Sequence, residues 1–96
     1  LFHDLEINQT VREVHKNGQL LDLTETEYSM LELLVANLHQ TFSAQRLFES
    51  VWQEPYYYGA NNTVTVHIRN LRSKVEDNPG NPELIKTVWG KGYRCD

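Results

Sequence analysis

The sequence predicts an α+β domain in which an N-terminal antiparallel sheet precedes three helices and a closing β-hairpin. Residues 1–23 contain alternating apolar and polar side chains and the hairpin dipeptide Asn17-Gly18. Three later segments repeat apolar residues at helical spacing, and the last segment joins two β-rich runs through Gly90-Lys91-Gly92. A chain of 96 residues is expected to form one domain over residues 1–96.

The N-terminal strands are predicted from local patterns. Leu5 and Ile7 alternate with polar neighbours, which is the period of a half-buried strand. Asn17-Gly18 favours a type I′ turn, because both central residues of that turn need positive φ. The turn would join a strand near residues 10–16 to one near residues 19–23.

The first helix is expected over about residues 25–37. Thr24 and Glu27 have the spacing of a capping box, in which each side chain accepts a hydrogen bond from a backbone N–H near the helix start. The apolar residues that follow at helical spacing are Leu31, Leu34, Val35 and Leu38.

A second helix is expected over residues 44–52, with Ser43 as its N-cap. Leu47, Phe48 and Val51 give this helix an apolar face. Residues 53–60 then form a loop, which contains a cluster of three tyrosines at positions 56–58. That cluster is either a protein-contact patch or an aromatic group that packs back onto the domain.

The third helix is expected over about residues 62–77, capped by Asn61 or Asn62 and ended by the turn residues at positions 79–82. Together with the second helix it would form a helix-turn-helix with a long turn. Its predicted buried stripe, at the spacing i, i+4, i+7, i+11, consists of Val64, Ile68, Leu71 and Val75.

The opposite face of the third helix is polar and has no acidic residue before Glu76. Arg69 can bind guanine and Asn70 or Asn62 can bind adenine in a DNA major groove, while Val66 can contact a thymine methyl group. The flanks of this face hold Thr63, Thr65, His67, Arg72 and Lys74, and all of these except Thr63 are expected to face phosphates. A solvated helix face with one stray valine is the alternative interpretation.

The charge of the chain is unevenly distributed. Nine Lys+Arg against 13 Asp+Glu give a net charge of −4. Residues 1–60 hold three basic and nine acidic side chains, a net −6, whereas residues 61–96 hold six basic and four acidic ones, a net +2. Such asymmetry suggests a face that binds a polyanion, although charged segments are more often only solvated.

Other patterns exclude several function classes. A hydrophobic share of 40% argues against general disorder, and no apolar run approaches the ~20 residues that cross a bilayer. The single Cys95 cannot form an internal disulfide, and the four histidines lack metal-ligand spacing. We therefore expect a cytoplasmic protein that is no enzyme and has no cofactor, and the start at Leu1 suggests an excised domain.

Four segments of the sequence carry a family resemblance. They are LTETEY from Leu23, LFESVW from Leu47, NTVTVHIRNLRSKVE from Asn62 and LIKTVWGKGYR from Leu84. Together they resemble the C-terminal effector domain of the OmpR/PhoB family of bacterial response regulators, and the resemblance extends over essentially the whole chain.

The resemblance implies a winged helix-turn-helix, with an N-terminal sheet, a three-helix core and a C-terminal β-hairpin wing at about residues 84–95. It implies control of transcription in a two-component system, by sequence-specific binding to promoter direct repeats. The recognition helix would lie in the major groove, with the wing at the adjacent minor groove or backbone. The family's receiver domain, which belongs to a phosphorelay with a sensor kinase, is absent from this chain.

The resemblance also implies partners and contact residues. Two protomers would bind head to tail on DNA, and the loop at residues 53–60 would contact RNA polymerase. The expected DNA-binding residues are Trp52, Asn62, Thr63, Thr65, Val66, His67, Arg69, Asn70, Arg72, Lys74, Thr87, Trp89 and Lys91.

Two positions depart from the family pattern. Trp89 occupies a wing position that is often an arginine inserted in the minor groove, so Lys91 is the alternative source of charge there. Asn70 occupies a recognition position that is often arginine, which predicts a changed base preference and retained binding.

Two other functions are weighed against DNA binding. A winged helix used for protein contact would more often show aromatic residues on the outward face of the third helix, where this chain has Arg69 and Asn70. An enzyme is disfavoured, because no catalytic group of residues stands out.

Overall fold

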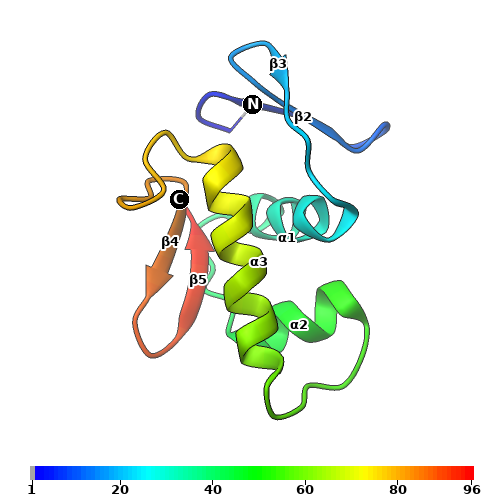
Figure 1. Cartoon of the computed structure of the whole chain (residues 1–96), viewed down its shortest axis with the longest axis vertical. Coiled ribbons are helices and arrows are strands. Elements are labelled where there is room, and N and C mark those ends of the chain that lie inside the picture. Colours follow the sequence, from blue (N-terminus) through cyan, green and yellow to red (C-terminus); the bar gives the residue numbers. More distant parts are fainter. Residues whose placement is uncertain (1) are drawn as a thin grey trace.

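The computed structural model describes residues 2–96 and contains three helices between two small antiparallel sheets (Figure 1). The elements in chain order are β1 (Leu5–Asn8), β2 (Glu13–Lys16), β3 (Gln19–Leu20), α1 (Glu25–Ala36), α2 (Ala44–Trp52), α3 (Ala60–Val75), β4 (Ile85–Val88) and β5 (Gly92–Cys95). The predicted α+β order is confirmed. Within the described residues no helix is long and apolar enough to cross a membrane.

The N-terminal sheet has the order β1-β2-β3, and its hairpin turn is the predicted one. Lys16 pairs with Gln19, so Asn17 and Gly18 are the central turn residues, with φ of 51° and 82°. The third strand is shorter than predicted, because only Gln19 and Leu20 pair with β2.

Both predicted caps of the first two helices are confirmed. Thr24 accepts a hydrogen bond from the Glu27 backbone N–H, and the Glu27 carboxylate accepts one from the Thr24 N–H, which completes the capping box of α1. The Ser43 hydroxyl accepts from the backbone N–H of Arg46 at 3.1 Å at the start of α2. The bounds of α2 are those predicted.

The predicted start and end of α3 are wrong. The N-cap is Gly59, in the left-handed region with φ of 98°, and no side chain caps the helix. A fully buried Ala60 is the first helical residue, so Asn61 and Asn62 lie inside the helix. At the other end Glu76 adopts an extended backbone, so the helix stops at Val75.

The buried carboxylate of Glu76 explains that stop. Its two oxygens accept hydrogen bonds from the backbone N–H groups of Glu83, Leu84 and Ile85. These bonds satisfy amides that would otherwise be buried without partners at the entry to β4. Glu76 therefore joins the end of α3 to the start of the last hairpin.

The core is built around α3, which crosses the middle of the molecule between the last hairpin and the other two helices (Figure 1). The predicted stripe is confirmed, since Val64, Leu71 and Val75 are fully buried and Ile68 is 1% exposed. This stripe packs in one cluster with side chains from α1, α2 and both sheets. The opposite face of α3 is consequently left outside the core.

The last hairpin, which we call the wing (residues 85–95), is fixed to the α1–α2 connection. Phe42 and Tyr93 exchange two backbone hydrogen bonds of 2.8 and 2.9 Å. The backbones approach so closely that a Cβ on Gly92 would lie 2.0 Å from the carbonyl oxygen of Phe42. Only glycine fits there without moving β5.

Gly92→Ala is predicted to destabilise the domain more than Gly90→Ala. Both glycines have positive φ, but a Cβ on Gly90 meets nothing within 4 Å. The Gly90 variant should lose about 1–2 kcal/mol from backbone strain alone, and the Gly92 variant should lose clearly more. Urea unfolding of both variants checks this, and equal losses would contradict the close approach.

Candidate nucleic-acid interface

The outward face of α3 presents the side chains that the sequence predicts for base contact. Asn62, Arg69 and Asn70 are exposed, and Val66 is 40% exposed although it is apolar. Among residues 2–96 no hydrogen bond or ion pair engages the side chains of Arg69 and Asn70. Their donors and acceptors are therefore available to a ligand that lies along this face.

The edge of α3 that faces α2 is held by aromatic contacts. Trp52 stacks on Phe48 with ring centroids 5.0 Å apart, and it meets His67 in a T-shaped contact whose ring centroids are also 5.0 Å apart. His67 Nδ1 in turn donates to the carbonyl oxygen of Thr63 at 2.8 Å. Trp52, Thr63 and His67 thus form one connected, half-buried edge between the two helices.

Arg72 lies on the other edge of α3 and binds the wing. Its guanidinium donates twice to the carbonyl oxygen of Ile85, at 2.8 and 3.1 Å, and once to the hydroxyl of Thr87 at 2.8 Å. It also lies 5.6 Å from the ring centroid of Tyr93. This burial lowers the pKa of Arg72 from its ordinary value. The sequence predicted that Arg72 points toward a phosphate, but its side chain instead reaches along the domain and binds the wing.

Lys74 also turns inward. Its Nζ donates to Oε1 of Glu27 at 2.6 Å, and the side chain of Glu27 is only 4% exposed. Burial favours the neutral carboxyl group, but the hydrogen bonds from Lys74 and from the Thr24 N–H outweigh it and leave the pKa of Glu27 lowered. Lys74 therefore links α3 to the capping box of α1.

The tip of the wing carries the remaining predicted residues. Trp89 is 89% exposed and Lys91 is exposed beside it, while the hydroxyl of Thr87 accepts a hydrogen bond from Arg72. A hollow between the wing tip and the first turns of α3 is lined by both elements, including Asn61 and Thr65. The Thr65 hydroxyl donates a hydrogen bond to the carbonyl oxygen of Asn61 in the preceding turn of α3, at 2.9 Å.

The structure divides the six cations of residues 61–96 into two groups. Three are bound within the domain, because Arg94 pairs with Asp96 at 2.9 Å in addition to the Arg72 and Lys74 contacts described above. In the described part of the chain no ion pair engages the other three, which are Arg69, Lys86 and Lys91. Arg69 lies on the outward face of α3 and Lys91 at the wing tip, whereas Lys86 alternates with the inward-facing Ile85 and Thr87 of β4 and points to the opposite face of the wing.

Sequence reasoning missed several contributors to this region. Asn61, expected only as a cap, lines the hollow beside the wing, and Tyr93 supports the Arg72 guanidinium. Glu27 was predicted for capping alone, and its second partner Lys74 lies 47 residues away in the chain. No sequence pattern indicates a pairing over that separation.

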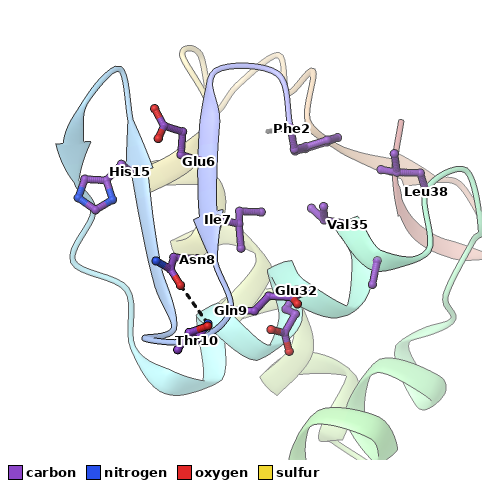
Figure 2. A pocket seen from close by; sticks show the side chains of 11 residues that line it. Phe2, Glu6, Ile7, Asn8, Gln9, Thr10, His15, Glu32, Val35 and Leu38 are labelled. Atoms are coloured by element: carbon purple, nitrogen blue, oxygen red, sulfur yellow. Dashed lines mark hydrogen bonds between the residues drawn. The ribbon is translucent and has the colours of Figure 1, made fainter.

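A second hollow lies on the other side of α1 and does not resemble a polyanion site. Figure 2 shows it between β1 and α1, bordered by Ile7 and Val35 and by the carboxylates of Glu6 and Glu32. The negative side chains oppose binding of a phosphate backbone there. Cys95 is no candidate nucleophile either, because burial raises the pKa of its thiol to about 12.

Comparison with known proteins identifies the class of this domain. The family described as "Transcriptional regulatory protein, C terminal" matches residues 18–95. An uncharacterized transcriptional regulatory protein of Bacillus subtilis, YrkP, is 50% identical over 90 residues, which cover 94% of this chain and 39% of YrkP. The chain thus spans about 40% of the length of the curated relatives it matches.

Solved structures agree with this result. The response regulator DrrB of Thermotoga maritima, an OmpR/PhoB homologue, superposes with a TM-score of 0.89 at 32% identity and covers 99% of this chain and 42% of its own. The RstA DNA-binding domain of Klebsiella pneumoniae, solved in complex with its RstA box, has a TM-score of 0.89 at 30% identity, with 99% and 93% coverage. The chain therefore belongs to the family of C-terminal winged-helix domains of OmpR/PhoB-type transcriptional regulators.

The Glu27–Lys74 pair predicts a defined pH dependence of stability. A lowered pKa in the folded state means that ionised Glu27 stabilises the fold above its ordinary value of 4.5, and that this stabilisation is lost as the pH falls through the folded pKa. Glu27→Gln should cost about 1–3 kcal/mol near pH 7. The difference in the free energy of unfolding between this variant and the wild type should become smaller below about pH 4.5.

Lys74→Met is the matched variant, because it keeps the apolar stem and removes the ammonium group from the buried carboxylate. It should also be least favourable near neutral pH, where Glu27 is charged and unpaired. Urea unfolding between pH 7 and pH 3 measures both differences. A disadvantage of either variant that stays constant across this range would contradict the ion-pair account.

Proposed function

We propose that this domain binds double-stranded promoter DNA in a sequence-specific way, with α3 in the major groove and the wing at the adjacent minor groove or backbone. The observation that carries the proposal is the two-sided character of α3. Its inner stripe is buried in the core, while Asn62, Val66, Arg69 and Asn70 project outward beside a wing whose tip is exposed. An α-helix fits the major groove, and these side chain types read base edges there.

The hollow between α3 and the wing would accommodate one phosphate strand of the DNA. If α3 enters the major groove and the wing reaches the minor groove, the phosphate strand between the two grooves passes through this hollow. Thr87 borders it, and because its oxygen already accepts from Arg72, its own proton is free to point at a phosphate. Lys91 adds a positive charge at the same border.

The comparisons support a role in transcription rather than catalysis. The RstA domain is described in complex with RstA box, and 93% of that chain is covered by this one. We propose that this domain likewise acts by binding, in the cytoplasm, as the effector part of a two-component response regulator. A receiver domain and a sensor kinase would then belong to the full-length system.

Two protein partners follow from the same proposal. A second protomer would bind head to tail on a direct repeat, and RNA polymerase would contact the loop at residues 53–60. Support for the second contact comes from Tyr58, which is fully exposed, whereas Tyr56 and Tyr57 pack back on Phe48 of α2. Tyrosines with this exposure are common at protein interfaces.

Selection of binding sites from random duplex DNA tests the central proposal. A reproducible motif about one half-site long is expected from the wild-type domain. Failure to enrich any motif would contradict sequence-specific binding and would favour the protein-contact alternative.

The salt dependence of binding should separate the available cations from the bound ones. Each phosphate contact contributes about −0.9 to the slope of log K against log salt, so Lys91→Ala should reduce the slope by about 0.9. Arg72→Ala should weaken binding through loss of the wing contacts and change the slope by much less. This replaces the expectation from sequence that Arg72 faces a phosphate.

A salt titration of both variants on one selected duplex measures these slopes. Arg12→Ala, which removes a cation of the acidic half of the chain, is the control and should leave the slope unchanged. A full unit of slope lost with Arg72→Ala would return Arg72 to the phosphate-binding set.

Asn70 is predicted to read an adenine–thymine pair. Its amide can both donate to and accept from adenine, whereas an arginine at this position offers only donors and prefers guanine. Asn70→Ala should cost about 1–3 kcal/mol on the selected site and far less on nonspecific DNA. Asn70→Arg should shift the preference at that position toward guanine.

Because Asn70 is exposed and makes no contact that the core needs, both variants should remain folded. Site selection with the wild type and the two variants is the measurement. An identical motif for all three proteins would show that Asn70 reads no base.

A further inference from the structure

Trp89 is the most prominent apolar side chain at the tip of the wing. It is 89% exposed, and it occupies a central position of the tight turn that is closed by the hydrogen bond from Lys91 N–H to the carbonyl oxygen of Val88 at 2.9 Å. No aromatic or cation contact engages the indole in the described chain. An indole so exposed contributes nothing to the core and presents its faces and edge to whatever lies beyond the wing.

The backbone of the turn that carries Trp89 is held by contacts on both strands of the wing. Val88 pairs with Gly92 at the end of the two strands, and Gly92 lies tight against the backbone of Phe42. Arg72 fixes β4 to α3 through its bonds to Ile85 and Thr87. The position of this turn relative to α3 is therefore set by backbone and side-chain contacts on both strands.

Trp89 also lies beside the hollow between the wing and α3. It lines the hollow that α3 borders with Asn61 and Thr65, so the indole and the first turns of α3 flank the same space. Its neighbours at the tip are the cation Lys91 and two glycines, while the acidic residues nearest in sequence, Glu83 and Asp96, lie beyond the other ends of the strands. The wing itself therefore places no acidic side chain at this tip.

The chemistry of the side chain determines what it can read. An uncharged indole gains little from the enhanced negative potential of a narrow minor groove, which attracts arginine. A flat apolar group can instead enter between base pairs from the minor groove and unstack them, which bends the duplex. Pyrimidine–purine steps unstack most easily, so such a group selects DNA by its deformability.

We propose that Trp89 is an apolar wedge that enters the minor groove at a pyrimidine–purine step beside the α3 site and thereby selects flexible flanking sequence. This inference rests on the proposed function, because it needs α3 in the adjacent major groove. It adds a second kind of readout to the hydrogen bonds of the α3 face. Lys91 then holds the phosphate next to the kinked step.

The test compares three substitutions at this position, which lies outside the core, so each variant should fold. Trp89→Phe keeps a flat apolar wedge, Trp89→Ala removes it, and Trp89→Arg replaces it with a cation. Each protein is subjected to site selection, and bending of the selected duplex is measured by fluorescence energy transfer between dyes on its two ends.

The wild type and Trp89→Phe should select TA or CA/TG steps in the flank and bend the duplex by the same angle. Trp89→Ala should keep the α3 motif, lose the flank preference and the bend, and bind the selected site about 5- to 100-fold more weakly. Trp89→Arg should recover affinity with a salt slope steeper by about 0.9 and should prefer stiff A-tract flanks.

Different results overturn different statements. A flank preference and a bend that persist in Trp89→Ala would eliminate the wedge while leaving α3 binding intact. A wild type that selects no core motif would overturn the proposed function itself.

Discussion

The structure depends on one helix that serves two environments. The inner stripe of α3 supplies four of the buried residues that hold the sheets and the other helices together, so the helix cannot rotate without losing the core. A rotation by one residue, about 100°, would bring Arg69 toward the core and expose Ile68. The direction of the outward face is thereby fixed by apolar packing, and no contact with a ligand is needed to orient it.

The charges of the chain follow the same division. Lys16, Lys74 and Arg94 all pair with acidic groups of the domain, and Arg72 satisfies carbonyl and hydroxyl oxygens of the wing. The net charge of −4 is a total over the chain and does not describe the surface that α3 and the wing present. What matters for association with DNA is the local field of a few available cations on α3 and the wing, since charges beyond about 8 Å are largely screened at physiological salt.

Local signals in the sequence predict most of the fold. Ser43 and the apolar face that follows it lie within one short segment, so both bounds of α2 can be read directly, and the same holds for the Thr24–Glu27 box. The start of α3 cannot be predicted in this way, because Gly59 in the left-handed region caps the helix and no side chain marks the position. The outward face is also predictable, since Asn70 and Val66 follow from helical periodicity alone. The inward direction of Arg72 and Lys74 is not, because their partners lie 13 to 47 residues away and depend on how whole elements pack.

The residues that fix the wing to the domain and the residues proposed to read DNA are two separate sets. The contacts that place the wing against α3 involve Arg72, Thr87 and Gly92, whereas the residues proposed to read DNA, Asn70 and Trp89, make no contact that stabilises the fold. Substitutions at exposed positions of this kind usually change stability by less than about 0.5 kcal/mol. Base preference at Asn70 and flank preference at Trp89 can therefore change one at a time, because neither residue has to satisfy the core. The helix and the wing would keep their relative position through every such change, so a new specificity would need no new scaffold.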